Sequence, residues 1–258
     1  MNATLRSWFW AGLVLTSNPV LAQESPTGES DSEEMAEARA GLRKEHGGLA
    51  TGMLLGERFE YGADDGDDFL LWDFQGWFGG DIKRLWIKTE GEYGMEPGRL
   101  EEGEIQALYS RAISPYFDLQ AGVRHDFEPG PSRSYAVLGV QGLAPYWFEL
   151  DAALFVSEEG DLTARVEAEY EILFTQRLIA QPRVELEVAA QEVSELGFGS
   201  GLSTVDFGLR LRYEIRREFA PYVGVSWTEL VGGTADFART AGQVTRSRSL
   251  VVGLRFWY

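Results

Sequence analysis

The sequence predicts an all-β fold: a transmembrane antiparallel β-barrel of about 12 strands, closed as an up-and-down meander. Two observations lead to this prediction. Segments of roughly ten residues, long enough for a tilted membrane-crossing strand, alternate apolar and polar side chains through most of the chain. An equally apolar segment then ends the chain, and such a strand would invite aggregation at an open sheet edge, whereas barrel closure removes the edge. We expect the barrel to comprise residues 49–258.

The final strand shows the alternation most clearly. One parity carries Leu250, Val252, Leu254, Phe256 and Tyr258, and the other carries Ser249, Val251, Gly253, Arg255 and Trp257. Because successive side chains of a strand point to opposite faces, this strand has one apolar and one mixed face. The terminal aromatic residue, with apolar residues two, four and six positions before it, also resembles the recognition signal of bacterial outer-membrane barrels.

The N-terminal residues precede the predicted barrel and have a different character. Residues 1–22 are expected to be a cleaved export signal, with Arg6 at its positive end, an apolar core at 8–15 and a cleavage site after Ala22. Residues 23–48 are acidic and poor in apolar side chains, so we expect a disordered periplasmic lead-in. Met35 and His46 within it are too few and too far apart to form a metal site by themselves.

The expected strands are connected by alternately short and mostly longer, polar links. The strands are expected at 51–61, 69–79, 84–93, 103–112, 116–127, 134–143, 146–156, 162–174, 178–190, 205–215, 221–230 and 248–258. Short periplasmic turns and long outer loops are typical of outer-membrane barrels. Three of the short links repeat a proline followed by an aromatic residue, at 115–116, 145–146 and 221–222. These aromatic residues are expected to form the periplasmic girdle, with each proline at a strand start, where a missing N–H does least harm.

Composition excludes several classes of function. The formal net charge is -18, from 41 acidic and 23 basic residues, which argues against binding to a nucleic-acid backbone. Cysteine is absent, so there is no thiolate metal site and no cysteine nucleophile. The mean hydropathy of -0.20 is expected of a barrel in which only alternate residues meet lipid.

The polar face of the strands carries charge of both signs. Charged residues of lumen parity are Lys88, Glu90, Glu92, Glu104, Asp118, Arg124, Asp126, Glu149, Asp151, Arg165, Glu167, Glu169, Glu171, Arg183, Glu185, Glu187, Asp206, Arg210, Arg212 and Glu214. Twelve strands enclose more space than the apolar side chains could fill, so the apolar face is expected to meet lipid. The charges either hold or pass cations, or form structural acid–arginine pairs. Mixed arginines favour the pairs, and the acidic excess favours cations over anions.

Longer motifs resemble a known family. They are found at 52–61 (GMLLGERFEY), 77–81 (WFGGD), 84–91 (RLWIKTEG), 107–115 (ALYSRAISP), 119–124 (LQAGVR), 137–149 (VLGVQGLAPYWFE) and 209–222 (LRLRYEIRREFAPY). In these motifs the chain resembles the copper-resistance protein B family, over nearly all of residues 52–258. The resemblance implies an outer-membrane protein of Gram-negative bacteria that binds copper ions in copper homeostasis. Members often carry a methionine- and histidine-rich N-terminal stretch, which this chain, with 4 Met and 2 His, lacks.

Copper prefers thioether and imidazole ligands, so the few such residues are candidates together with lumen acids. The candidate metal ligands are Met53, Met95, His125, Glu90, Glu92, Glu104, Glu167 and Glu169. For Met53 a rim or lipid-facing position is the simpler interpretation, and for His125 an outward position near the outer rim. The acidic loop at 64–68 resembles a divalent-cation turn but lacks the distal glutamate of an EF-hand, which favours a solvated acidic tip.

Two functions remain open at this point. The first is a copper-resistance barrel that binds copper ions and sequesters them or aids their passage; the alternative is a general pore or structural barrel without specific copper binding. An enzyme is not expected, because no serine shares the outward face of His125 two residues on. Expected partners are outer-membrane lipid and, by resemblance, a periplasmic copper oxidase or copper carrier, with no nucleic acid. The barrel is expected to be monomeric.

Overall fold

The computed structural model describes residues 35–38, 41, 49–64, 68–96 and 98–258. The chain divides into two compact units, and the barrel is the unit that comprises residues 47–258. The expected export signal and most of the expected lead-in lie outside the described residues, and their boundaries stay predictions. Residues 35–38 are helical and exposed. None of the helices in the described segments is long and apolar enough to cross a membrane.

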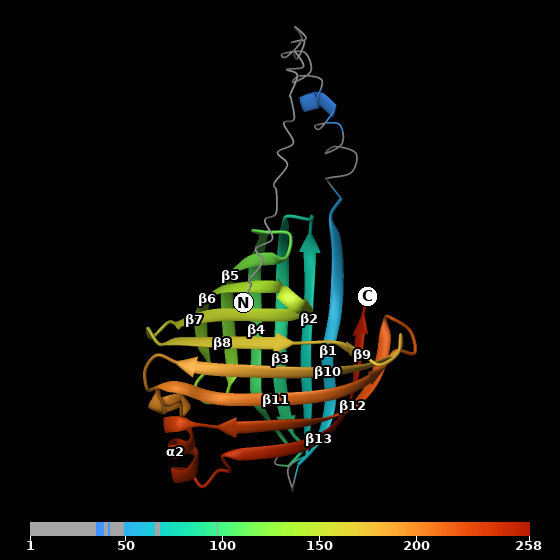
Figure 1. Ribbon diagram of the computed structural model, residues 1–258. Helices are drawn as coiled ribbons and strands as arrows, with labels where there is room; N and C mark the ends of the chain where they lie inside the picture. The colour runs from blue at the N-terminus through green and yellow to red at the C-terminus, as the bar shows by residue number, and fades with distance from the viewer. Residues whose placement is uncertain (1–34, 39–40, 42–48, 65–67, 97) are drawn as a thin grey trace, which may run out of the picture. The chain divides into compact units, whose positions relative to one another are not determined.

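The barrel is a closed antiparallel meander, as predicted (Figure 1). Its strands are β1 Thr51–Ala63, β2 Phe69–Gly79, β3 Lys83–Gly94, β4 Arg99–Ala112, β5 Phe117–Glu128, β6 Arg133–Ala144, β7 Phe148–Ser157, β8 Leu162–Glu169, β9 Ile172–Leu173, β10 Leu178–Ala189, β11 Gly201–Tyr213, β12 Phe219–Leu230 and β13 Arg246–Trp257. Each pairs with its neighbour in the chain, and β13 pairs with β1, where Leu54 and Tyr258 exchange two backbone hydrogen bonds of 2.8 Å. Closure therefore leaves no edge strand, which is what makes the apolar final strand stable.

The predicted strand at 162–174 is interrupted. β8 and β9 both pair with β10 and together occupy one strand position in the barrel wall. The thirteen named strands therefore form a twelve-stranded barrel. The break lies opposite Pro182, whose carbonyl accepts a 3.1 Å bond from the Tyr170 N–H. Proline has no N–H to return the second bond of that pair, so the ladder is lost at this point.

We call the two ends of the barrel the turn end and the loop end. The turn end carries the links at 80–82, 113–116, 145–147, 174–177 and 214–218, and the loop end carries those at 64–68, 95–98, 129–132, 158–161, 190–200 and 231–245. Of the five links expected to be longer, those at 64–68, 95–98 and 129–132 are as short as the turn-end links because the strands extend further than predicted, whereas those at 190–200 and 231–245 are long. β4, for example, begins at Arg99 rather than at 103.

The link at 231–245 contains an unpredicted helix, α2 Gly232–Thr240. It buries Thr234, Ala235 and Ala238, and its contacts are with β11 and β12. The loop before β11 meets it closely: the Gly199 N–H donates to Thr234 Oγ1 at 2.9 Å, and a Cβ at Gly199 would lie 2.4 Å from Gly233 Cα. Two small residues are required here because the two backbones are in contact.

The predicted faces are confirmed. Leu250 and Val252 are 69% and 53% exposed on the outer wall, whereas Arg210 and Arg212 are buried inside. β1 departs from simple alternation, because its register with β2 shifts between Gly56 and Arg58. Leu55 on one side of this bulge and Arg58 on the other are consequently both buried in the interior.

Candidate functional site

The charged lumen is centred on Arg165 of β8. Its guanidinium lies within ion-pair distance of four carboxylates from two sides of the barrel: Glu187 at 3.0 Å, Glu104 and Glu185 at 3.2 Å, and Glu90 at 3.3 Å. The Arg165 side chain is 18% exposed. One cation therefore joins β3, β4 and β10 across the interior through residues that alternation had placed on lumen faces.

Two further arginines extend this network. Arg183 of β10 forms a bidentate pair with Glu167, with both N–O distances 2.7 Å, and also contacts Glu185. Arg58 of β1 bonds Asp73 at 3.1 Å and also Glu90, which it shares with Arg165. Buried charges are stabilised only when they are paired and hydrogen-bonded, and these are.

The remaining lumen cations form smaller pairs around the network. Arg124 bonds Glu104 at 2.8 Å and Asp126 at 2.5 Å, and its guanidinium carbon lies 4.6 Å from the centre of the Phe155 ring. Further pairs join Arg210 to Glu60, Arg212 to Glu171, Lys88 to Asp151 and Arg84 to Asp118. The lumen is thus filled largely by acid–arginine pairs, the structural alternative that the sequence favoured.

An apolar cluster occupies one side of the interior. Trp86, Leu108, Tyr135, Val137 and Phe155 are buried together, with Trp77 packed against them. These residues come from β2, β3, β4, β6 and β7. The apolar cluster and the ion pairs fill much of the barrel interior, so the space left there for a ligand is limited.

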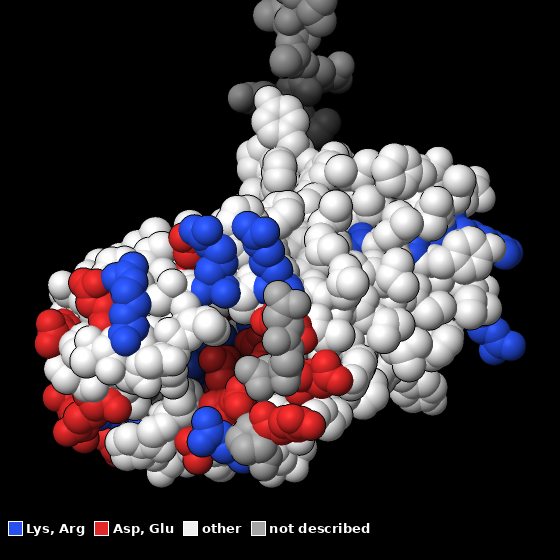
Figure 2. Space-filling model, turned by 90° about the horizontal axis from the view of Figure 1, so that it is seen from below, with Lys and Arg blue, Asp and Glu red and all other residues white. Residues whose placement is uncertain are grey.

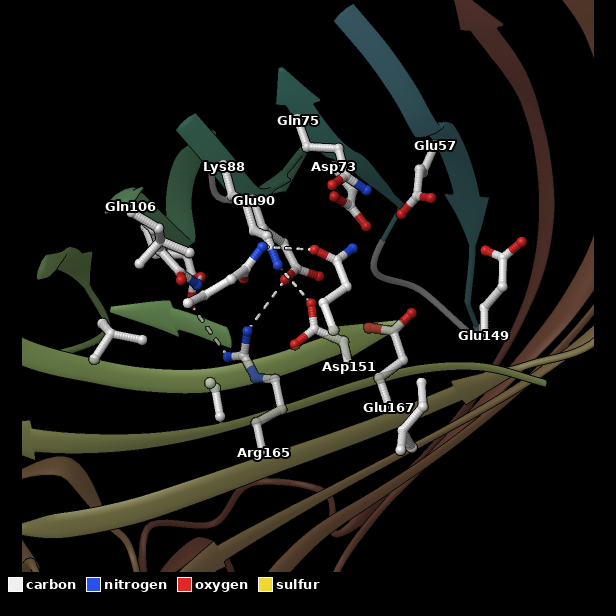
Figure 3. A pocket seen from close by; sticks show the side chains of 18 of the residues that line it. Glu57, Asp73, Gln75, Lys88, Glu90, Gln106, Glu149, Asp151, Arg165 and Glu167 are labelled. Carbon is white, nitrogen blue, oxygen red and sulfur yellow. Dashed lines mark hydrogen bonds and ion pairs between the residues drawn. The ribbon is translucent and has the colours of Figure 1, made fainter. Parts of the chain in front are cut away.

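A cavity of about 360 Å³ remains between the apolar cluster and the ion pairs. Glu57 of β1 and Glu149 of β7 line it and form no ion pair or hydrogen bond with any described residue, whereas Glu90 and Glu167 on its wall are paired with arginines. Figure 3 shows the four carboxylates of Glu57, Asp73, Glu149 and Glu167 facing this space. The Gln75 Oε1 atom, also on its wall, is buried without a hydrogen-bond partner. The cavity therefore presents oxygen ligands, and two of its carboxylates lie outside any ion pair among the described residues.

The loop end carries a second acidic hollow. A cavity of about 480 Å³ is lined there by Glu92, Glu101, Glu102 and Glu128, among others. Figure 2 shows acidic side chains gathered around a hollow on this face, with basic ones at its rim. Nearby, the buried Arg133 at the start of β6 contacts two links, 158–161 through Asp161 at 2.5 Å and Glu159 at 3.2 Å, and 190–200 through Glu195 at 3.0 Å. A cation approaching this end meets negative charge first.

The predicted soft ligands are not brought together. Met53 lies near the turn end opposite Trp77 and has the inward parity of Leu55, which agrees with the expected rim position rather than with a lipid-facing one. Met95 lies in the link between β3 and β4 at the loop end and is 42% exposed. His125 lies on the outer wall near the loop end, as expected, with Nδ1 3.0 Å from Ser134 Oγ. The three residues lie in three separate places.

The predicted acidic ligands lie in the lumen but are mostly occupied. Glu90, Glu104, Glu167 and Glu169 each contact an arginine, and Glu92 lines the acidic hollow at the loop end. Within the described part of the chain, no group of three or more His, Cys, Asp or Glu residues is arranged to hold a metal ion. The ligand set stays a prediction.

Sequence reasoning missed several lumen residues. The bulge in β1 changes the parity of the strand at that point. Simple alternation therefore did not identify Glu57, Arg58 and Glu60 as lumen residues. Asp73 was overlooked because the residues around it, Leu71, Trp72 and Phe74, are apolar or aromatic. Ser134 was missed as the partner of His125, because it comes from the next strand rather than from the same one.

The chain matches known proteins over the whole barrel. A family model described as copper resistance protein B precursor (CopB) matches residues 50–258. The copper resistance protein B homolog of Pseudomonas syringae pv. tomato is 43% identical over 213 residues, which are 83% of this chain and 72% of the relative. Copper resistance protein B of Escherichia coli is 42% identical over 213 residues, 83% of this chain and 71% of the relative.

Among solved structures, the NanC porin is similar in fold alone. The TM-score is 0.52 with 10% sequence identity, over 80% of this chain and 99% of that one. The porin likeness agrees with the closed barrel, and the two relatives and the family model agree with the motifs found along the strands. The chain therefore belongs to the copper-resistance protein B family.

Proposed function

We propose that this outer-membrane barrel serves copper resistance by admitting copper ions to its acidic lumen and holding them there weakly, rather than in a tight multi-ligand site. The observation that carries the proposal is the cavity of about 360 Å³ with Glu57 and Glu149, two carboxylates that form no ion pair with any described residue. Copper ions are the cargo in this proposal.

The donor set supports weak rather than tight binding. Carboxylate and amide oxygens are poor ligands for copper compared with thioether and imidazole groups. Met53, Met95 and His125 lie too far from one another to share an ion. Cations would therefore be concentrated by the field of the lumen and exchanged quickly, which suits passage better than storage.

The test begins with copper tolerance of a deletion strain in a host without a second copy of the gene. We expect sensitivity that the wild-type gene restores and that Glu57→Gln/Glu149→Gln restores only in part. Asp236→Asn is the matched control, because Asp236 is exposed on α2 and away from the lumen. Full restoration by the double variant would contradict the role of the two carboxylates.

The second candidate is a general pore or structural barrel without specific copper binding. It is favoured by the lack of a metal-holding group in the described part of the chain. It predicts unchanged copper tolerance on deletion and, in planar bilayers, conductance that does not distinguish copper from other divalent cations. A periplasmic copper oxidase or carrier that exchanges ions at the turn end belongs to the first candidate only.

We also propose that the barrel has no enzymatic activity. Ser134, from the strand next to that of His125, does contact the His125 ring. However, no hydrogen bond to the second ring nitrogen of His125 comes from any described residue, and a catalytic histidine needs a group that orients it.

A further inference from the structure

The outer wall at the loop end carries an arginine pair on an aromatic platform. Arg248 of β13 lies directly opposite Trp227 of β12, and Arg246 lies opposite Glu229. The guanidinium carbons of Arg246 and Arg248 are 5.8 and 5.4 Å from the centre of the Trp227 ring. Both arginines are exposed, and with Trp227 they form what we call the β12–β13 patch.

The position of this patch is unusual for charged residues. All three side chains have the outward parity of Leu250 and Val225, which belong to the apolar wall. An arginine on the lipid face of a barrel costs roughly 2–4 kcal/mol at the bilayer midplane and little near an interface. The patch must therefore lie at the level of the lipid headgroups, where β12 ends and β13 begins.

The charges of the patch are only partly compensated. Arg246 forms an ion pair with Glu229, whereas Arg248 forms no ion pair or hydrogen bond with any residue that the structure describes. Arg246, Arg248 and Glu229 together carry one positive charge in excess, and the N–H donors of the Arg248 guanidinium are available to a ligand. A planar guanidinium is matched in geometry to a phosphate group, and stacking on tryptophan holds it in place.

The wall beside the patch suits hydrocarbon chains. Leu250, Val252, Val223 and Val225 are exposed by 69%, 53%, 58% and 44%, and they run from the patch toward the middle of the barrel on the same two strands. A molecule with a phosphate at its head and acyl chains below would contact both regions. Because short turns face the periplasm in this class of barrel, the loop end faces the outer leaflet.

From this arrangement we propose that the β12–β13 patch binds the phosphate of an outer-leaflet phosphoglycolipid of the lipid A type, with its acyl chains against Leu250 and Val252. This site lies outside the lumen and is independent of the copper proposal. The competing interpretation is structural: the two arginines only stabilise the strand pair by stacking on Trp227.

The test uses the folded full-length mature barrel in neutral detergent and measures lipid binding by native mass spectrometry. The probes are bisphosphorylated lipid A and the same lipid without its phosphates. Each arginine near a charged headgroup layer contributes about 1 kcal/mol, so Arg248→Gln should weaken binding of the phosphorylated lipid about fivefold. Arg246→Gln/Arg248→Gln should abolish the preference for it.

Two further variants separate recognition from folding. Glu229→Gln frees Arg246, so it should bind the phosphorylated lipid more tightly than wild type although it breaks an ion pair. Arg111→Gln is the matched control, since Arg111 is an exposed arginine near the turn end, and it should change nothing. Heat-dependent migration in gels verifies that each variant is folded.

Several results would overturn the proposal. They are equal binding of the two lipids by wild type, an Arg248→Gln affinity equal to that of Arg111→Gln, or weaker binding by Glu229→Gln. Displacement of the lipid by inorganic phosphate at equal concentration would also overturn it, because the patch would then be a simple anion site. A loss of folding in Arg248→Gln with normal lipid binding by the folded fraction would support the structural interpretation.

Discussion

Replacing Arg165 by methionine tests whether the lumen network stabilises the barrel. The substitution keeps most of the side-chain volume and removes the single cation that contacts Glu90, Glu104, Glu185 and Glu187. Glu90 and Glu104 retain Arg58 and Arg124, and Glu185 retains Arg183. Glu187 loses its only ion pair among the described residues.

The expected loss in the free energy of unfolding follows from the number of carboxylates that keep another arginine. Removing one member of a buried ion pair costs roughly 3–5 kcal/mol, because the other charge is left without compensation. The side chains of Arg165 and Glu187 are 18% and 26% exposed, so water offsets part of this penalty. Since three of the four carboxylates keep another arginine, we expect the lower end, about 3 kcal/mol.

The free energy of unfolding is measurable by urea titration of the barrel in lipid vesicles, followed by tryptophan fluorescence. Arg99→Met is the control, because Arg99 is 70% exposed and 3.8 Å from Glu101, and exposed pairs contribute about 0–1 kcal/mol. Arg165→Met/Glu187→Gln should recover part of the loss. A cost for Arg165→Met no larger than that of the control would refute the view that the network is stabilising.

Two other predictions concern the backbone and the outer wall. A Cβ at Gly122 would lie 2.0 Å from the carbonyl oxygen of Ala107, so Gly122→Ala should cost about 1–3 kcal/mol in the same urea titration, while Gly80→Ala, which meets no atom within 4 Å, should be neutral. Equal effects would contradict the steric argument. His125→Ala should leave hydrolysis of phospholipid and peptide substrates at the background level of wild type; turnover by wild type that this substitution abolishes would show an enzyme after all.

Much of the fold is predictable from the sequence because a strand has a strict period of two. The parity of Leu250 against Ser249, or of Leu209 against Arg210, depends only on local order along the chain, and both predicted faces are confirmed. Departures arise where a contact from another strand changes the local geometry. Pro182 breaks the ladder of the strand beside it, and the bulge after Gly56 reverses the parity of β1.

The candidate site was predictable only in part. Parity places a charge in the lumen but does not say which charge it will meet, because partners come from strands far apart in the chain. Arg165 and Glu90 are 75 residues apart, and Arg210 and Glu60 are 150 apart. The short α2 was missed for a similar reason: Ala235 and Ala238 are buried only because β11 and β12 lie beneath them.

The pairing of the lumen acids bears directly on how copper could be handled. A carboxylate that already accepts a bidentate bond from arginine, as Glu167 does from Arg183, must lose that bond before it can coordinate an ion. Such exchange is unfavourable inside a barrel, because the displaced arginine would then be uncompensated. Among the described residues, Glu57 and Glu149 form no ion pair, so a cation could meet them without displacing an arginine. Under the copper role proposed above, the arginines would limit the number of carboxylates that can coordinate an ion, which would favour transit over storage.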